Sequence, residues 1–492
     1  MAPRSILLRT PFVPRAYAYR LRVALTRSAQ RVARLTAARL IAAWWCTPVN
    51  ARAYPAHECQ PTHRSRTQPC KLAGFVSDLQ GARIRWHSPW FPPSIMSLIF
   101  QPSANIARLK ESATLAVAAK ARALKAAGLD IIDLGAGEPD FDTPAFIREA
   151  ATAAITAGAT RYTATEGILP LREAIAADAN RLLAHGPPIT AAEVVVSSGS
   201  KQSLYNACVC CFGPGDEVLI PSPAWTSYYE MVELARAVSV PVFGEEANDL
   251  KVTAAQLAAA ATPRTKGLML NSPSNPTGAV YTQDELSAIL TLAAERGWWV
   301  LADEIYLRIA YEGGARSALE VATTRDNLIV INGVAKAYAM TGWRIGWTIA
   351  PVAVSRAMTA FQSHTTSNAA AVSQHAALAA LGRPQEADEA VHHMVREFQR
   401  RRDAVMAVLS AYPTVRYVHP AGAFYLYINV AGFRGAADAG AAFAAAVLEE
   451  HQVAVVPGSA FLTPDWIRAS YATSESVAVA GFTRIARCLT GA

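Results

Sequence analysis

The sequence predicts an α/β fold with a mostly parallel central sheet that helices cover on both faces. From about residue 141, short apolar runs alternate with helical stretches, and turns join them. Continuously apolar strands of this kind are typical of parallel sheets that are buried on both faces. The predicted strands are 194–197, 217–221, 267–271, 298–303 and 327–332, with one more within 342–349.

After about residue 380 the pattern changes. A long charged helix is predicted over 385–410, and hairpin-like apolar runs follow at 414–429 and 453–456. This change predicts a second, smaller domain of the α+β type.

The net charge of +8 comes from one end of the 492-residue chain. Residues 1–95 contain 15 Lys and Arg and two acids, Glu58 and Asp78, whereas residues 96–492 contain 31 basic and 36 acidic residues. The basic balance therefore does not belong to the main body, and no nucleic-acid partner is expected. No run of 18 or more apolar residues occurs, so no membrane span is expected.

Residues 1–95 also differ from the rest in composition, with four Trp, scattered Pro and almost no acid. We expect this extension to be disordered or an artefact of an upstream translation start, with Met96 as the natural first residue. A targeting peptide is one alternative, because such peptides are rich in Arg and poor in acids. A functional extension is the other.

The seven cysteines suit a reducing cytosol, so a cytoplasmic location is expected. Their number is odd, and Cys208, Cys210 and Cys211 are crowded into one predicted helix. The ten histidines show no metal-ligand clustering, and no metal is expected.

Lys336 is the most informative residue for the chemistry. The apolar run 328–331 leads to it, and Arg344 follows eight residues later with no acid between them. A lysine beside a fixed cation has a lowered pKa, and the free amine condenses with aldehydes. Since an arginine fork binds phosphate, the pair predicts a site for an aldehyde that carries a phosphate, which is pyridoxal phosphate. The alternative is that both residues are solvated at the surface.

Two further segments supply polar groups at strand ends. Asn275 lies in the turn after strand 267–271, and Asp303 ends strand 298–303. Open α/β sheets bind ligands at the carboxyl ends of their strands. A buried carboxylate is costly unless paired, and a protonated pyridine nitrogen would pair with it and make the ring an electron sink. The alternatives are an ordinary turn at Asn275 and a helix cap at Asp303.

Over roughly residues 100–490 the chain resembles the class I and II aminotransferases, the fold-type I pyridoxal-phosphate enzymes, and within them the bacterial aspartate and prephenate subgroup. The resemblance implies that Lys336 binds the cofactor covalently and moves a proton from the substrate's Cα. Asp303 would keep the ring nitrogen protonated, and Tyr306 and Asn275 would contact the ring's phenolic oxygen. It also implies a homodimer in which Tyr162 reaches the neighbouring subunit's phosphate.

The resemblance places the cofactor's phosphate at the start of a predicted helix, where backbone amides bind anions. Many family members have Ser before the cofactor-binding lysine, whereas this chain has Ala335, which lacks the hydroxyl for one phosphate contact. The residues assigned to the phosphate are Gly199, Ser200, Lys201 and Arg344.

Substrate contacts are also implied by the resemblance. Arg468 matches the arginine that holds the substrate's α-carboxylate, and Trp225 matches the aromatic residue that stacks on the cofactor ring. Gly137 lies in a loop similar to the family's N-terminal substrate loop. Lys201 and Thr114 match a lysine and a threonine that meet a distal carboxylate, although a solvated lysine is the alternative for Lys201.

The resemblance divides the chain after the extension into three parts. Residues 96–140 form an arm and part of the small domain, 141–380 form the large cofactor-binding domain, and 381–492 complete the small domain.

The predicted function is ping-pong transfer of an amino group from L-aspartate to 2-oxoglutarate, with prephenate as a companion substrate. A broad-specificity aromatic or alanine-type aminotransferase is the alternative. A transcription regulator with an aminotransferase-like domain is more distant, because it needs a helix-turn-helix pattern and residues 46–95 show no such periodicity.

Overall fold

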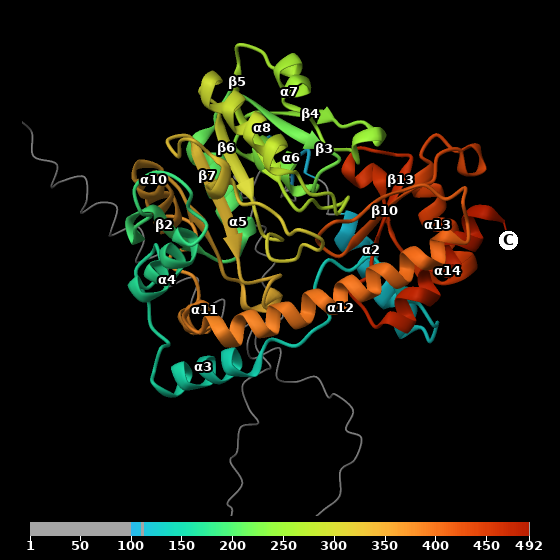
Figure 1. Ribbon diagram of the computed structural model, residues 1–492, viewed down its shortest axis with the longest axis horizontal. Coiled ribbons are helices and arrows are strands. Elements are labelled where there is room, and N and C mark those ends of the chain that lie inside the picture. The colour runs from blue at the N-terminus through green and yellow to red at the C-terminus, as the bar shows by residue number, and fades with distance from the viewer. Residues whose placement is uncertain (1–99, 110–112, 492) are drawn as a thin grey trace, which may run out of the picture. The chain divides into compact units, whose positions relative to one another are not determined.

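A seven-stranded sheet lies at the centre of the fold (Figure 1). The computed structural model describes residues 100–109 and 113–491, so the predicted extension 1–95 lies outside the described residues. The strand order is β2-β8-β7-β6-β5-β3-β4, and β8 alone runs against the others. The strands are β2 Val194–Ser197, β3 Glu217–Ser222, β4 Val238–Phe243, β5 Thr265–Asn271, β6 Trp299–Asp303, β7 Leu328–Gly333 and β8 Gly346–Ile349.

Helices cover both faces of this sheet, because successive strand residues point to opposite sides. Val194 and Val196 belong to one hydrophobic core, which includes residues of α3, α4, α7, α8 and α11. Val195 belongs to a second core, with residues of α5, α6 and α10. These helices are α3 Ala145–Thr156, α4 Leu169–Asn180, α5 Ser200–Cys211, α6 Ser227–Leu234, α7 Ala254–Ala260, α8 Gln283–Arg296, α10 Val352–Ser363 and α11 Ala371–Gly382.

The predicted α/β fold is confirmed, and each predicted strand of the parallel sheet is present to within two residues. The predicted strand within 342–349 begins only at Gly346. Residues Thr341–Trp343 form a 3-10 turn, and Arg344 has a left-handed φ of 57°, which delays the extended conformation. β4 was not predicted.

A second group of elements packs beside the central sheet and has its own core. It contains a four-stranded antiparallel sheet of order β12-β13-β10-β9 and the parallel pair β1 and β11. The strands are β1 Ile132–Asp133, β9 Tyr417–Val418, β10 Tyr425–Asn429, β11 Val453–Ala454, β12 Val456–Pro457 and β13 Trp466–Ser470. The remaining helices are α2 Ala113–Ala126, α9 Ala318–Val321, α12 Pro384–Ser410, α13 Ala439–His451 and α14 Glu475–Thr490.

The long helix α12 links the two groups of elements. Figure 1 shows it extending from α11, beside the central sheet, to α14, beside the second group, and it contacts both helices. All described residues belong to one compact unit that spans 97–492. Within the described part of the chain, no helix is both long enough and apolar enough to span a membrane.

Candidate active site

A cavity of about 580 Å³ lies where strands β5, β6 and β7 of the central sheet end and helix α5 begins. Parts of β10 and β13 close its other side. The position agrees with the rule that open α/β sheets bind ligands at the carboxyl ends of their strands. The predicted site residues that line it are Gly137, Ser200, Lys201, Trp225, Asn275, Asp303, Tyr306, Lys336, Arg344 and Arg468.

Asp303 is held at the end of β6 without a basic partner at ion-pair distance among the described residues. It is 3% exposed, and its carboxylate accepts hydrogen bonds from the Tyr228 hydroxyl at 2.6 Å and from the Ile305 amide at 3.1 Å. Burial raises the pKa of Asp303 to about 6, although both hydrogen bonds act to lower it. No helix follows Asp303, so the helix-cap alternative is not observed.

Lys336 follows β7 and extends its amine to the carbonyl oxygen of Gly137. Burial is the largest cause that lowers the pKa of Lys336, to about 8, and Arg468 and Arg344 lower it further. The sequence led us to expect the arginine as the main cause, but removal of the amine from water has the larger effect. The fold also brings an acid, Glu138, close enough to raise this pKa.

The start of α5 and Arg344 form a cradle suited to an anion. The amides of Ser200 and Lys201 have no hydrogen-bond partner among the described residues. Arg344 donates to the Thr341 carbonyl at 2.9 Å, and it lies against Gly199. A Cβ at Gly199 would lie 2.4 Å from an Arg344 guanidinium nitrogen, and its φ is +89°, so only glycine fits this close approach.

Arg468 on β13 is a buried cation that forms no ion pair with any described acidic side chain. It is 1% exposed, and it donates to Asn275 Oδ1 at 3.0 Å and to the Gly135 carbonyl at 2.9 Å. Its Nε has no partner, and its guanidinium carbon lies 4.4 Å from the centroid of the Tyr425 ring. A buried guanidinium that lines a cavity and has no acidic partner is suited to bind a carboxylate.

Two tyrosines that the sequence analysis missed hold predicted residues in place. Tyr228 donates to Asp303, and the Tyr425 hydroxyl lies 2.8 Å from that of Tyr306. Tyr425 also lies beneath Arg468. Tyr228 is 75 positions from Asp303 in sequence, and Tyr425 is 119 positions from Tyr306, so no local pattern connects them.

Trp225 and Lys201 lie together on one wall of the cavity. The Lys201 amine is 4.7 Å from the centroid of the Trp225 ring. Burial and then Arg344 lower the pKa of Lys201. Lys201 is therefore positioned as a second cation in the same cavity as Arg468.

Among the predicted site residues, Tyr162 and Gly199 do not line this cavity. The Tyr162 side chain is 92% exposed and is not among the lining residues. Thr114 lies near the start of α2, and its side chain is outside the described part of the structure.

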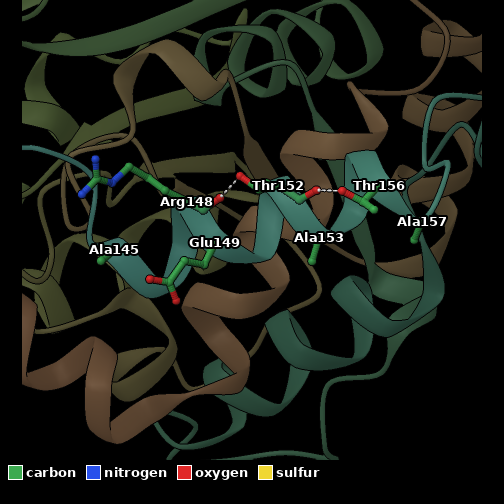
Figure 2. A pocket seen from close by; sticks show the side chains of 7 residues that line it. All are labelled: Ala145, Arg148, Glu149, Thr152, Ala153, Thr156 and Ala157. Carbon is green, nitrogen blue, oxygen red and sulfur yellow. Dashed lines mark hydrogen bonds between the residues drawn. The ribbon is translucent and has the colours of Figure 1, made fainter.

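A second, more open hollow of about 710 Å³ lies along α3 (Figure 2). Its hydroxyl groups on Thr152 and Thr156 donate to carbonyl oxygens of the same helix, at 3.0 Å each. Arg148 and Glu149 are the charged side chains among its described lining residues, and no predicted site residue is among them. This hollow therefore contains none of the residues from which the candidate active site is built.

Comparison with known proteins gives matches over the same part of the chain. Residues 129–481 match the profile of the family described as aminotransferase class I and II. The chain is 45% identical over 399 residues to the aspartate aminotransferase of Streptomyces avermitilis, which covers 79% of this chain and 97% of that protein. It is 46% identical over 386 residues to the aspartate/prephenate aminotransferase of Cereibacter sphaeroides, with 76% and 95% covered.

A solved structure shows the same fold. The aspartate aminotransferase from Thermus thermophilus with maleate is similar with a TM-score of 0.75 and 40% identity, over 79% of this chain and 100% of that one. The comparisons confirm the fold class and the resemblance predicted from sequence.

Proposed function

We propose that this chain, which belongs to the class I and II aminotransferases, uses pyridoxal phosphate to transfer the amino group of L-aspartate to 2-oxoglutarate, with prephenate as a companion acceptor. One observation supports the proposal most directly. Arg468 is buried, has no acidic partner among the described residues, and lines the same cavity as Lys336 and Asp303. A carboxylate for Arg468, an aldehyde for Lys336 and a protonated ring nitrogen for Asp303 would satisfy these three groups.

The described residues fit the cofactor. Lys336 provides an amine with a pKa lowered to about 8 for the covalent attachment, and Asp303 provides a buried carboxylate for the ring nitrogen. The unpaired amides of Ser200 and Lys201, with Arg344, would hold the phosphate. When bound, the cofactor supplies an electron sink for negative charge that develops on the substrate's α-carbon.

The protein's own groups bind the substrate and move a proton. Arg468 would fix the α-carboxylate, which places the α-carbon near Lys336, and the neutral Lys336 amine takes the proton from that carbon. Tyr306, oriented by the Tyr425 hydroxyl, would donate a hydrogen bond to the ring's phenolic oxygen. Asn275, which accepts from Arg468, would approach the same oxygen through its amide nitrogen.

The experiment that tests this function is a substrate panel on the purified full-length chain loaded with pyridoxal phosphate. Aspartate, glutamate, alanine and phenylalanine are supplied one at a time, and the cofactor absorbance and the keto-acid product are followed. Aspartate is expected to give the highest kcat/KM. A higher value for phenylalanine or alanine would favour the broad-specificity alternative, and no spectral change with any amino acid would overturn the proposal.

The choice of aspartate rests on Lys201 as the second cation, and a mutation tests it. Lys201→Ala is expected to lower kcat/KM for aspartate and glutamate about 10- to 100-fold, because a charged hydrogen-bond donor to the distal carboxylate is lost. Phenylalanine and alanine should be almost unaffected, so the ratio of kcat/KM for aspartate over phenylalanine is the decisive quantity.

Two variants control this measurement. Lys266 is exposed on β5 and does not line the cavity, so Lys266→Ala should leave the ratio unchanged. Arg468→Ala should lower kcat/KM for every amino acid by a similar factor, because each has an α-carboxylate. If Lys201→Ala left the ratio of kcat/KM for aspartate over phenylalanine unchanged, this lysine would not bind the distal carboxylate.

The small domain of 96–140 and 381–492 would close over the large domain of 141–380. A homodimer would bring Tyr162, which is 92% exposed, to the phosphate of the neighbouring subunit, and sedimentation together with Tyr162→Phe tests this.

A cytoplasmic location is supported by the free thiols of Cys208, Cys210, Cys211 and Cys488.

A shortened chain that begins at Met96 is expected to fold, bind cofactor and turn over as the full chain does. The family match begins only at residue 129, and residues 1–95 supply no predicted site residue. Comparison of Tm, bound cofactor and kcat between the two chains checks this. An insoluble or inactive short chain would place the extension within the functional fold.

A further inference from the structure

Arg401, on the long helix α12, contacts two consecutive residues, Asp140 and Phe141, of the loop 135–144. It is 7% exposed, and it donates to Asp140 Oδ1 at 2.7 Å. Its guanidinium carbon lies 5.0 Å from the ring centroid of Phe141 and 5.6 Å from that of Phe398. The Nε of Arg401 has no hydrogen-bond partner. Asp140 is the only acid hydrogen-bonded to Arg401 among the described residues.

The same loop contacts the candidate active site at its other end. The Gly135 carbonyl accepts from Arg468 at 2.9 Å, and the Gly137 carbonyl accepts from the amine of Lys336. The position of the loop backbone therefore determines how these two side chains are presented to the cavity.

The middle of the loop has few other contacts. It has no helix or strand, and Glu138, Asp140 and Asp142 are exposed, although Pro139 is buried and Glu138 accepts a hydrogen bond from the Thr341 hydroxyl at 2.8 Å. Its far end is attached through the Thr143 hydroxyl, which donates to the Ala339 carbonyl at 2.7 Å. An exposed irregular segment moves readily unless buried contacts restrain it, and Arg401 provides such contacts at Asp140 and Phe141.

We propose that Arg401 is a positioning residue that fixes the loop 135–144 through Asp140 and Phe141, and thereby sets substrate affinity. This inference rests on the proposed function, because it assigns Arg468 and Lys336 to the amino-acid site. Arg401 lines no part of the cavity, so it acts only through the loop. Loss of this contact raises KM for all amino acids and changes kcat less, because Arg468, which would bind the α-carboxylate, donates to the Gly135 carbonyl of the loop, whereas Lys336 is also held by the end of β7.

The test compares Arg401→Gln and Asp140→Asn in the cofactor-loaded full chain with Arg400→Gln as the matched control. Arg400 lies on the same helix, is exposed, and pairs with Glu397 at 2.8 Å, away from the loop. Loss of a charge-assisted hydrogen bond is expected to raise KM about 10-fold in either loop variant, with kcat within about 3-fold of wild type. The double variant should be no worse than Arg401→Gln, because both remove the same contact.

Hydrogen exchange provides a second readout that does not depend on turnover. Amides of 136–142 should exchange about 10-fold faster in Arg401→Gln and Asp140→Asn, with α12 and the central sheet unchanged. Arg401→Lys keeps the charge but not the planar guanidinium, so its KM should lie between that of Arg401→Gln and that of the wild type. Unchanged KM and exchange in Asp140→Asn, or faster exchange across the whole of α12, would overturn the proposal. A wild type without transaminase activity would instead refute the proposed function, while the exchange result would still test the grip on the loop.

Discussion

Replacing Lys336 with alanine is expected to lower kcat by about 10²- to 10⁴-fold, the usual contribution of a positioned proton-transfer group. The side chain is the one amine that the fold places at the end of β7, beside Asp303 and Arg468. Without it, no described side chain is positioned in the same way to take the proton from the substrate's α-carbon. Arg344 and Arg468 cannot substitute, because an arginine stays protonated.

Lys336→Arg is the control for charge. It keeps a cation at the same position but has no neutral form, so it should be as inactive as the alanine variant. Borohydride reduction of the wild-type protein followed by peptide mapping should find the pyridoxyl group on Lys336. Label on another lysine, or near-normal turnover by Lys336→Ala, would contradict the whole assignment.

The lowered pKa adds a pH dependence to this prediction. Because the pKa of Lys336 is about 8 and the neutral amine is the reactive form, the rate of cofactor loading by the cofactor-free protein should rise with pH and level off above about 8. A loading rate that rises only near pH 10 would show an ordinary, solvated lysine.

The elements that the sequence predicts best are those with strong local patterns. Strands β5, β6 and β7 are apolar runs that end in turns, and their parallel pairing places Asn275, Asp303 and Lys336 at one edge of the sheet. The roles of these three residues remain predictions, but their meeting at one cavity follows from topology alone.

The elements that the sequence did not predict have weak or misleading patterns. β4 contains Pro241, which cannot donate in a sheet, and it is tolerated because β4 lies at the edge. β13 contains Arg468, a charge that breaks an apolar strand pattern. The antiparallel direction of β8 is not visible in sequence, because an apolar run reads alike in both directions.

Contacts between distant segments were beyond the reach of pattern analysis. Tyr228 on Asp303, Tyr425 on Tyr306 and Arg401 on Asp140 each join residues separated by at least 75 positions. The lowered pKa of Lys336 has the same origin, since burial depends on how the whole chain packs.

Asp303→Ala is expected to retain weak cofactor binding and to lose about 10³-fold or more in turnover, which corresponds to about 4 kcal/mol. Asp303 is the buried carboxylate that would keep the ring nitrogen protonated, and an unprotonated ring is a poor electron sink. Asp303→Asn tests the charge itself, because the amide keeps the shape and can still accept from Tyr228. It should be nearly as inactive as the alanine variant. Since burial raises the pKa of Asp303 to about 6, the cofactor-free protein should also lose cofactor affinity as pH falls through 6.

The neighbouring residue Glu304 provides the control for loss of a buried carboxylate. It is 5% exposed and accepts hydrogen bonds from Ser317 and from the Ala318 amide, on the side of β6 away from the cavity. Glu304→Gln keeps these acceptors in part, so it should change Tm more than kcat. Turnover is measured with the same amino acid at saturating cofactor, so that affinity and chemistry are separated. If Asp303→Asn kept half of the wild-type kcat under these conditions, the carboxylate would not be the partner of the ring nitrogen, and the cavity would need a different chemistry.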